Sequence, residues 1–229
     1  MPNFCENELT ISGPDVERVL AAIADPASDD PDEHILDFDK IVPYPQEWKD
    51  LDQHNAEYQA KFFAIAKDDP QRDEKLKALA DEYGVEPGSP WLKDGYNAGG
   101  YEWCIQNWST KWNACRVALT KRPASAPLPE CIACAHCAMT HKTAILEVLA
   151  CSRCGAPLPD TRPVVAFIEF ETAWSPPEAV IEKLASMFPD HTFDLAYYEG
   201  GVGFCGQARW SGGEEEFHHQ SDYSGPRGG

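Results

Sequence analysis

Residues 4–23, FCENELTISGPDVERVLAAI, decide the fold, because a strand pattern runs directly into a helix pattern. Apolar and polar side chains alternate as far as Leu9-Thr10-Ile11, which is typical of a strand with one buried face. Gly13-Pro14 ends this pattern, and Pro14 suits the first position of a helix. Apolar residues then recur at helical spacing: Val16, Val19, Leu20 and Ile23. The stretch predicts a strand from Phe4 to Ser12 and an amphipathic helix after it.

A second strand and helix follow the same order near the C-terminus. Residues 164–172 are mostly apolar, which predicts a strand buried on both faces or nearly so. Ser175-Pro-Pro-Glu178 has the spacing of a capping box, with Ser175 as N-cap and Glu178 three positions later. The helix after it shows one apolar face, formed by Val180, Ile181, Leu184 and Met187.

Four further segments have strand patterns, namely 35–42, 113–121, 192–198 and 204–210. Without its insertions the order is that of a split β-α-β core, so we predict an α+β, ferredoxin-like fold with an antiparallel sheet. The core is expected over 1–122 and 161–212, with a helical insertion over 45–85 and a zinc-ribbon insertion over 128–160. Residues 213–229 are rich in Gly, Glu, His and Ser and are expected to form a flexible tail.

The helical insertion reads as a hairpin from about 46 to 84. A stripe at helical spacing comprises Trp48, Leu51, Tyr58, Phe62 and Ile65, and Asn55 interrupts it. Asp69-Pro70 has the composition of a helix start, and Gly84 that of a helix end. We expect the aromatic side of this hairpin to pack on the main domain.

The central segment carries five cysteines in paired spacing. It reads Cys131-Ile-Ala-Cys134-Ala-His-Cys137, followed after 13 residues by Cys151-Ser-Arg-Cys154. Two C-x-x-C pairs are typical of a zinc site; the Cys131/Cys134 register leaves 16 residues between the pairs, within the usual range of about 15–20, and the Cys134/Cys137 register leaves 13, slightly short of it. Cys131 with Cys134 is one register for the first pair. We prefer Cys134 with Cys137, because Ile-Ala-Cys-Ala-His-Cys-Ala then matches Leu-Ala-Cys-Ser-Arg-Cys-Gly-Ala in the second half.

We therefore predict a structural Zn²⁺ held by four thiolates, those of Cys134, Cys137, Cys151 and Cys154. Four thiolates in tetrahedral geometry leave no position for a reacting water. Cys131 could replace Cys134 or Cys137 as a ligand, and His136 and His141 are weaker alternatives. Reduced thiols without metal, disulfides and an iron–sulfur cluster are the other readings of the same spacing.

The formal net charge is −19, and it is unevenly spread. Residues 1–100 carry 9 basic and 23 acidic side chains, whereas 101–162 carry 7 basic and 4 acidic ones. An acidic surface repels phosphate backbones, so a basic protein partner fits better than nucleic acid. The bland alternative is that the charge only maintains solubility. No apolar run is long enough to span a membrane, and the start lacks a secretory signal, so we expect a cytoplasmic protein.

An aromatic cluster, Trp103, Trp108 and Trp112, offers two interpretations. It could be a stacking platform with Lys111 and Arg116 nearby, or it could fill the joint between insertion and sheet, which is the more usual role of large aromatic residues. Phosphate-loop, G-x-G-x-x-G, G-x-S-x-G and H-E-x-x-H motifs are absent from the sequence. Nothing in the chain singles out a catalytic pair, so we predict that it is not an enzyme.

Three stretches resemble the YubB-type ferredoxin-like family of phage and conjugative-plasmid proteins: MPNFCENELTISG (1–13), GYEWCIQNWSTKWNA (100–114) and FETAWSPP (170–177). Phe4 stands where that family would have Trp. The resemblance implies the same fold and a mobile-element origin, and it implies no catalytic residues.

The first functional hypothesis is therefore a non-enzymatic interaction protein that binds a macromolecular partner, such as a host protein in counter-defence. One alternative is nucleic-acid binding through the zinc ribbon and the Trp-rich segment. The other is an enzyme with a pocket between the sheet and the helical hairpin.

Overall fold

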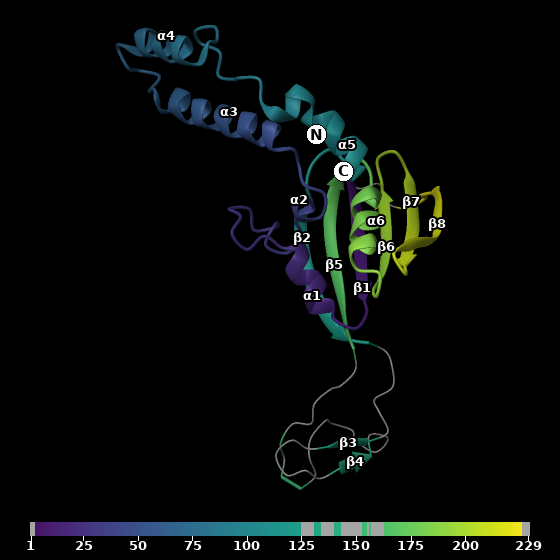
Figure 1. Cartoon of the computed structure of the whole chain (residues 1–229). Coiled ribbons are helices and arrows are strands. Elements are labelled where there is room, and N and C mark those ends of the chain that lie inside the picture. The colour runs from purple at the N-terminus through teal and green to yellow at the C-terminus, as the bar shows by residue number, and fades with distance from the viewer. Residues whose placement is uncertain are drawn as a thin grey trace.

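The computed structural model describes residues 3–124, 131–133, 140–142, 153–154, 156 and 163–225 (Figure 1). The strands are β1 Phe4–Ser12, β2 Cys115–Pro123, β3 Cys131–Ala133, β4 Thr140–Lys142, β5 Val164–Ala173, β6 Thr192–Glu199, β7 Phe204–Ser211 and β8 Glu214–Asp222. The helices are α1 Val16–Ile23, α2 Phe38–Ile41, α3 Gln46–Ala64, α4 Arg72–Tyr83, the short π-helical turn η1 Tyr96–Gly100, α5 Tyr101–Trp108 and α6 Glu178–Met187. Within these described ranges, every helix is too short or too polar to cross a membrane.

Six strands form one antiparallel sheet in the order β2-β5-β1-β6-β7-β8. The first four of these, with α1 after β1 and α6 after β5, have the strand order of a split β-α-β fold. This arrangement confirms the predicted α+β, ferredoxin-like core, and β7 and β8 extend its sheet at one side.

One face of the sheet carries the hydrophobic core. Side chains of β1 alternate along the strand, and Cys5, Leu9 and Ile11 are fully buried. They belong to one cluster with the apolar faces of α1 and α6, which lie on the same face of the sheet in Figure 1. The alternate residues of each strand point to the opposite face, which we call the open face. The candidate site lies on the open face.

The segment 35–42 was predicted as a strand, and this prediction was wrong, because it contains the short helix α2. The side chain of Asp37 accepts a hydrogen bond from the backbone N–H of Asp39 at 2.9 Å and so caps the helix. Phe38 and Ile41 are buried at a spacing of three residues, which suits a helix. The segment 35–42 is too short for the spacing of its apolar residues to distinguish a strand from a helix.

The predicted flexible tail was also wrong for Glu214–Asp222, which form the edge strand β8. Every residue of β8 is exposed, so its sequence has no buried alternation to reveal a strand. The strand is held by its ladder with β7. His218 also connects β8 to β6 and α6, because its Nε2 lies 2.9 Å from Tyr197 Oη and 3.1 Å from Glu178 Oε1.

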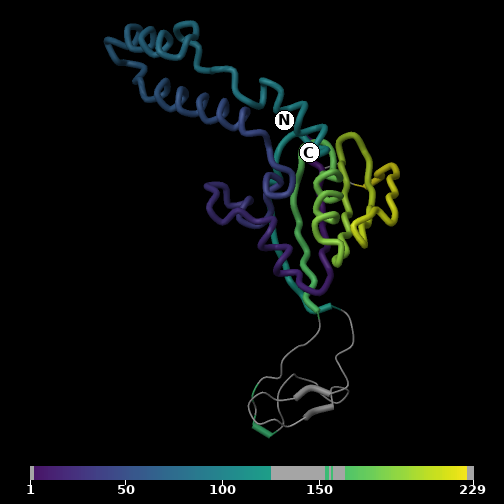
Figure 2. Tube along the Cα trace, in the orientation of Figure 1, coloured from purple at the N-terminus to yellow at the C-terminus, as the bar shows by residue number. Residues whose placement is uncertain are grey.

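Helices α3 and α4 confirm the predicted hairpin, which projects from the body as an arm (Figure 2). The arm's aromatic side was expected to pack on the main domain. Instead it forms a core of its own from Tyr58, Phe62, Leu76 and Leu79. Asn55 interrupts the stripe because it is buried to secure the loop that follows the arm, where its Oδ1 accepts a hydrogen bond from Leu92 N at 3.0 Å. Helix α4 begins at Arg72, two residues after Pro70.

Two other helices begin later than predicted. Helix α1 begins at Val16, with Asp15 rather than Pro14 at its start. Helix α6 begins at Glu178, and its backbone is capped from another loop, since Ala179 N donates to Ser109 Oγ at 3.3 Å. Ser175 is not the cap, because its hydroxyl donates to the carbonyl oxygen of Ser109. The chain after α5 therefore fixes the start of α6.

The cysteine segment enters the fold between β2 and β5, which are neighbouring antiparallel strands. Their ladder closes at the pair Pro123 and Val164, and Ala124 N donates to Pro163 O at 2.7 Å. Cys154 lies in an exposed turn, whereas Cys134, Cys137 and Cys151 lie outside the described residues. Strand β3 pairs with β4 in a separate two-stranded sheet.

Candidate functional site

The open face of the sheet contains a groove of about 800 Å³. Two successive rows of side chains form it. The first row crosses β5, β1, β6, β7 and β8 and consists of Glu171, Glu6, Tyr198, Cys205 and Ser221. The second row crosses all six strands and consists of Ala118, Glu169, Glu8, Ala196, Gln207 and His219.

The shape of the groove follows from side-chain size. Ala118 and Ala196 are small and flank the second-row glutamates on either side, which lowers the floor there. Tyr198 and Tyr223 form one wall, with their rings stacked at 5.0 Å between centroids and an interplanar angle of 22°. A groove with a flat aromatic wall and a hollow floor can accept an extended chain with long side chains.

The floor of the groove places like charges opposite each other. Glu6 pairs directly with Glu171, and Glu8 pairs directly with Glu169, on the adjacent central strands β1 and β5. Opposed like charges in a sheet destabilise it, by about 0.2–1 kcal/mol for each pair. Glu8 and Glu169 therefore carry a cost that the fold itself does not require, whereas at the first pair Glu171 is also contacted by Arg116.

Arg116 is the one Lys or Arg among the described residues lining this groove. It lies at a β-bulge between Cys115 and Ala118 and has a φ of 55°. The carboxylate of Asp32 fixes the bulge by accepting hydrogen bonds from Arg116 N at 2.6 Å and Val117 N at 3.0 Å. Bulges re-aim side chains, and this one directs the guanidinium of Arg116 to Glu171.

The contact between Arg116 and Glu171 involves both carboxylate oxygens. Nη1 of Arg116 donates to Oε1 at 2.9 Å and to Oε2 at 2.8 Å. The guanidinium carbon also lies 4.9 Å from the ring centroid of Phe4. Tyr198 faces the other side of this row, where its hydrogen bond to Glu6, aided by burial, raises its pKa to about 12. Arg116 and Tyr198 thus place hydrogen-bond donors on either side of the two first-row glutamates, Glu171 and Glu6.

The predicted tryptophan cluster divides into two parts. Trp108 is 5% exposed and donates its indole N–H to Val42 O at 2.8 Å. Trp103 packs its ring against Trp108, Tyr44 and Trp48 at the base of the arm. These two residues serve packing, as the structural interpretation predicted.

Trp112 belongs to a second cavity, of about 560 Å³, that is lined by Tyr96, Asn97, Tyr101, Glu102, Lys111, Trp112 and Trp174. Nζ of Lys111 lies 4.6 Å from the ring centroid of Trp174 and 5.5 Å from that of Tyr101. Trp174 is 39% exposed and has a φ of 72°, a conformation that is costly for a bulky residue. Backbone strain of this kind gathers at functional sites.

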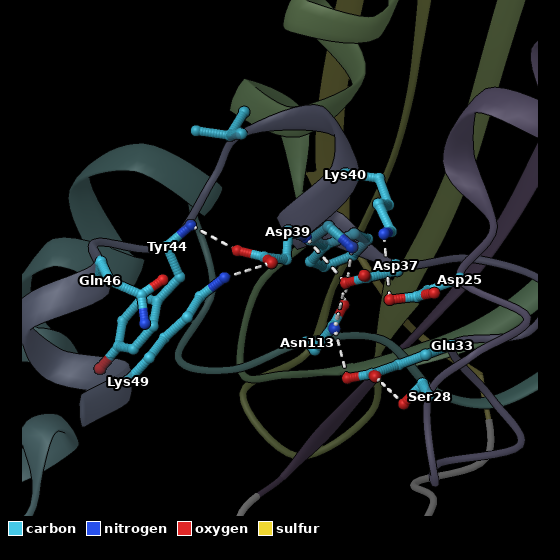
Figure 3. Close-up of polar contacts among 12 residues, drawn as sticks. Asp25, Ser28, Glu33, Asp37, Asp39, Lys40, Tyr44, Gln46, Lys49 and Asn113 are labelled. Carbon is cyan, nitrogen blue, oxygen red and sulfur yellow. Dashed lines mark hydrogen bonds and ion pairs between the residues drawn. The ribbon is translucent and has the colours of Figure 1, made fainter. Parts of the chain in front are cut away.

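Asn113, the last residue of the segment 107–113, makes several structural hydrogen bonds (Figure 3). Its Nδ2 donates to Asp37 Oδ1 at 2.8 Å and to Glu33 Oε1 at 3.0 Å, and its Oδ1 accepts from Phe38 N at 2.9 Å. Thr110, in the same segment, donates to Ala173 O at 3.0 Å. Residues 107–113 therefore connect α2, α5 and β5.

The described residues contain no group of three or more His, Cys, Asp and Glu side chains that could hold a metal ion. Three of the four predicted zinc ligands lie outside those residues, so this observation concerns the remainder of the chain. Cys5 and Cys104 are buried, and burial raises the pKa of each thiol to about 12, which makes them poor nucleophiles. They behave as core residues.

Sequence reasoning did not single out the groove, although a signal was present. Both central strands contain Glu-x-Glu, at 6–8 and 169–171. Side chains two apart share a face of a strand, so these pairs had to lie on one face in each strand. Only the register, which sets Glu6 opposite Glu171, brings the four together.

Comparisons with known proteins bear on the fold. No curated protein sequence matches the chain. The crystal structure of protein api92 from Yersinia pseudotuberculosis is similar over 99% of this chain and 100% of that chain, with 11% sequence identity and a TM-score of 0.41. Residues 165–225, which include nearly all of β5 and the chain through β8, match the family model described as the ferredoxin-like domain in Api92-like protein.

Proposed function

We propose that this chain is a non-enzymatic interaction protein that binds a basic segment of a partner protein in the groove on the open face. The observation that carries the proposal is the opposition of Glu6 to Glu171 and of Glu8 to Glu169. An arrangement that weakens the sheet is typical of a site whose function outweighs the cost. A cationic segment in the groove would relieve the repulsion.

The charge of the whole chain supports this proposal. A net charge of −19 attracts basic partners over a distance and repels nucleic acid. The groove crosses six strands, and adjacent strands lie about 4.8 Å apart, so it is about 24 Å wide. An extended segment of about seven residues covers that width.

The zinc ribbon is a separate part of the proposal. Four cysteines in two C-x-x-C pairs, Cys134 with Cys137 and Cys151 with Cys154, are proposed to hold one structural Zn²⁺, with Cys131 as an alternative ligand. Thiolates suit Zn²⁺, and closed four-thiolate sites supply folding energy rather than catalysis. Metal analysis of purified protein should give one zinc per chain. Replacing Cys151 and Cys154 with serine should abolish zinc binding. An unchanged zinc content would contradict the assignment of these cysteines as ligands.

The mobile-element origin and a host-protein partner also belong to this proposal. They rest on the resemblance of residues 1–13, 100–114 and 170–177 to YubB-type proteins, and on the acidic face. Proteins that mobile elements direct at host factors need no catalytic machinery, which agrees with a site built from carboxylates and aromatic rings.

The test of the groove is a binding titration with a labelled seven-residue peptide of mixed Arg and Lys at moderate salt. The double variant Glu8→Gln, Glu169→Gln should weaken binding at least tenfold. The control is Glu57→Gln, Glu86→Gln, which removes the same charge from exposed positions on the arm and the loop that follows it. It should weaken binding less than twofold. Equal losses in both variants would show that the peptide responds to net charge and would overturn the groove as the site.

The second cavity favours a second candidate function, binding of single-stranded nucleic acid. Lys111 lies beside the exposed ring of Trp174, and aromatic rings with a nearby cation can stack bases and contact phosphate. The test is a titration with a short single-stranded DNA at 50 mM salt. Lys111→Ala and Trp174→Ala should each reduce binding, and no binding by the unaltered protein would end this candidate.

A further inference from the structure

Arg116 shows how the groove holds a guanidinium. Its Nη1 contacts both oxygens of Glu171, and its guanidinium carbon lies 4.9 Å from the Phe4 ring centroid. A guanidinium is planar, so it can face a carboxylate with its edge and an aromatic ring with its flat side. A lysine ammonium is a point charge that cannot hold both contacts with the same geometry.

The remainder of the groove offers the same two elements. Glu6, Glu8 and Glu169 are carboxylates without an ion-pair partner in the described part of the chain. Glu6 lies directly beside Tyr198, whose ring stacks on Tyr223 to form the wall, whereas Glu8 and Glu169 lie in the next row, beside Ala196. The carboxylate of Glu6 beside the ring of Tyr198 therefore repeats the surroundings that Arg116 already has at Glu171 and Phe4.

Arg116 is well placed to leave Glu171. Its backbone is fixed by Asp32 independently of the guanidinium contact. Its side chain is 67% exposed, whereas that of Glu171 is 19% exposed. The guanidinium can therefore turn into solvent without disturbing the bulge, and Glu171 then becomes available to another cation.

We infer that the groove selects arginine over lysine in its partner segment, and that Arg116 occupies one arginine position in the free protein. This inference rests on the proposed function and adds the chemistry of the partner. The incoming arginine takes the place of Arg116 on Glu171, and further arginines meet Glu6, Glu8 and Glu169. Arg116 thus weakens binding of every partner by competing with it.

The test compares two seven-residue peptides that differ only in having three arginines or three lysines. The arginine peptide should bind unaltered protein at least fivefold more tightly. Arg116→Ala should tighten binding of the arginine peptide by three- to tenfold. Arg122→Ala is the matched control, because it removes the same charge from the same strand outside the groove lining, and it should change the affinity less than twofold.

Three results would overturn the inference. Equal affinities of the two peptides, with both lost in Glu8→Gln, Glu169→Gln, would leave the proposed function standing and remove the arginine selectivity. Equal tightening in Arg116→Ala and Arg122→Ala would reduce the effect of Arg116 to net charge. Failure of both peptides to bind would overturn the proposed function with the inference. Circular dichroism of each variant separates these results from a loss of folding.

Discussion

Glu8 on β1 lies directly opposite Glu169 on β5, in the middle of the sheet. Glu8→Gln removes one charge of this pair, so it should raise the free energy of unfolding by about 0.2–1 kcal/mol. The same variant should bind basic peptides less well. Urea denaturation measures the first effect, with Glu57→Gln on the exposed side of the arm as the control. A loss of stability in Glu8→Gln would show that the glutamate makes a favourable contact.

Truncation of Trp108 should cost much more stability than truncation of Trp174. Trp108 is buried and hydrogen-bonded to Val42, so Trp108→Ala should reduce the free energy of unfolding by about 3–5 kcal/mol. Trp174 is partly exposed, so Trp174→Ala should change it by about 0.5 kcal/mol. Thermal and urea unfolding measure both. A large loss in Trp174→Ala would make the second cavity part of the packing.

Asp37 should make stability fall as pH rises, because burial raises its pKa above the ordinary value of 3.8. Between pH 3.8 and the raised pKa the folded state binds more protons than the unfolded state, so each rise in pH in that window weakens folding. Asp37→Asn retains an oxygen for the bonds from Asn113 and Asp39, and it should be more stable than the parent protein at neutral pH. The difference should vanish near pH 3.

Asp25 supplies the opposite control for this measurement. Its hydrogen bond with Lys40 lowers its pKa, so Asp25 contributes stability above pH 3.8 that is lost as the pH falls through its folded pKa. Asp25→Asn should therefore be less stable than the parent protein at neutral pH. The same sign of change in both variants would contradict the assignment of their environments.

The arm should unfold without the sheet. Phe62 is 8% exposed within the arm's own core, and its neighbour Phe63 is 63% exposed. Phe62→Ala should lower the local opening free energy of α3 and α4 by about 3 kcal/mol, whereas Phe63→Ala should leave it nearly unchanged. Hydrogen exchange of the arm and of β1, read separately, measures both. Equal loss of protection in β1 would show that arm and core unfold together.

Local patterns predicted the parts of the fold that bury a long apolar face. The helical spacing of Val16 and Val19 predicted α1, and the alternation around Leu9 predicted β1. The apolar stripe through Tyr58 and Phe62 predicted the arm. The patterns failed where burial was absent or short. Strand β8 is exposed at every position, and α2 has only four residues. Neither length nor hydrophobicity could have identified them.

The candidate site was harder to predict than the fold. The cross-strand register that brings Glu8 to Glu169 depends on contacts between residues about 160 positions apart in the chain. The aim of Arg116 depends on a bulge and on Asp32, which lies in a distant loop. No pattern within one strand contains that information. The acidic character of the site, by contrast, was visible in the composition of residues 1–100.

The closed end of the β2–β5 ladder has a consequence for how this chain can evolve. The backbone bond from Ala124 to Pro163 completes the hairpin before the cysteine segment begins. The β2–β5 hairpin thus already holds together the two ends that residues 125–162 connect, and a two-residue turn could join the same ends. Replacing residues 125–162 with another segment should leave the strand registers and the groove unchanged. The inserted segment can therefore diverge in evolution while the groove is conserved.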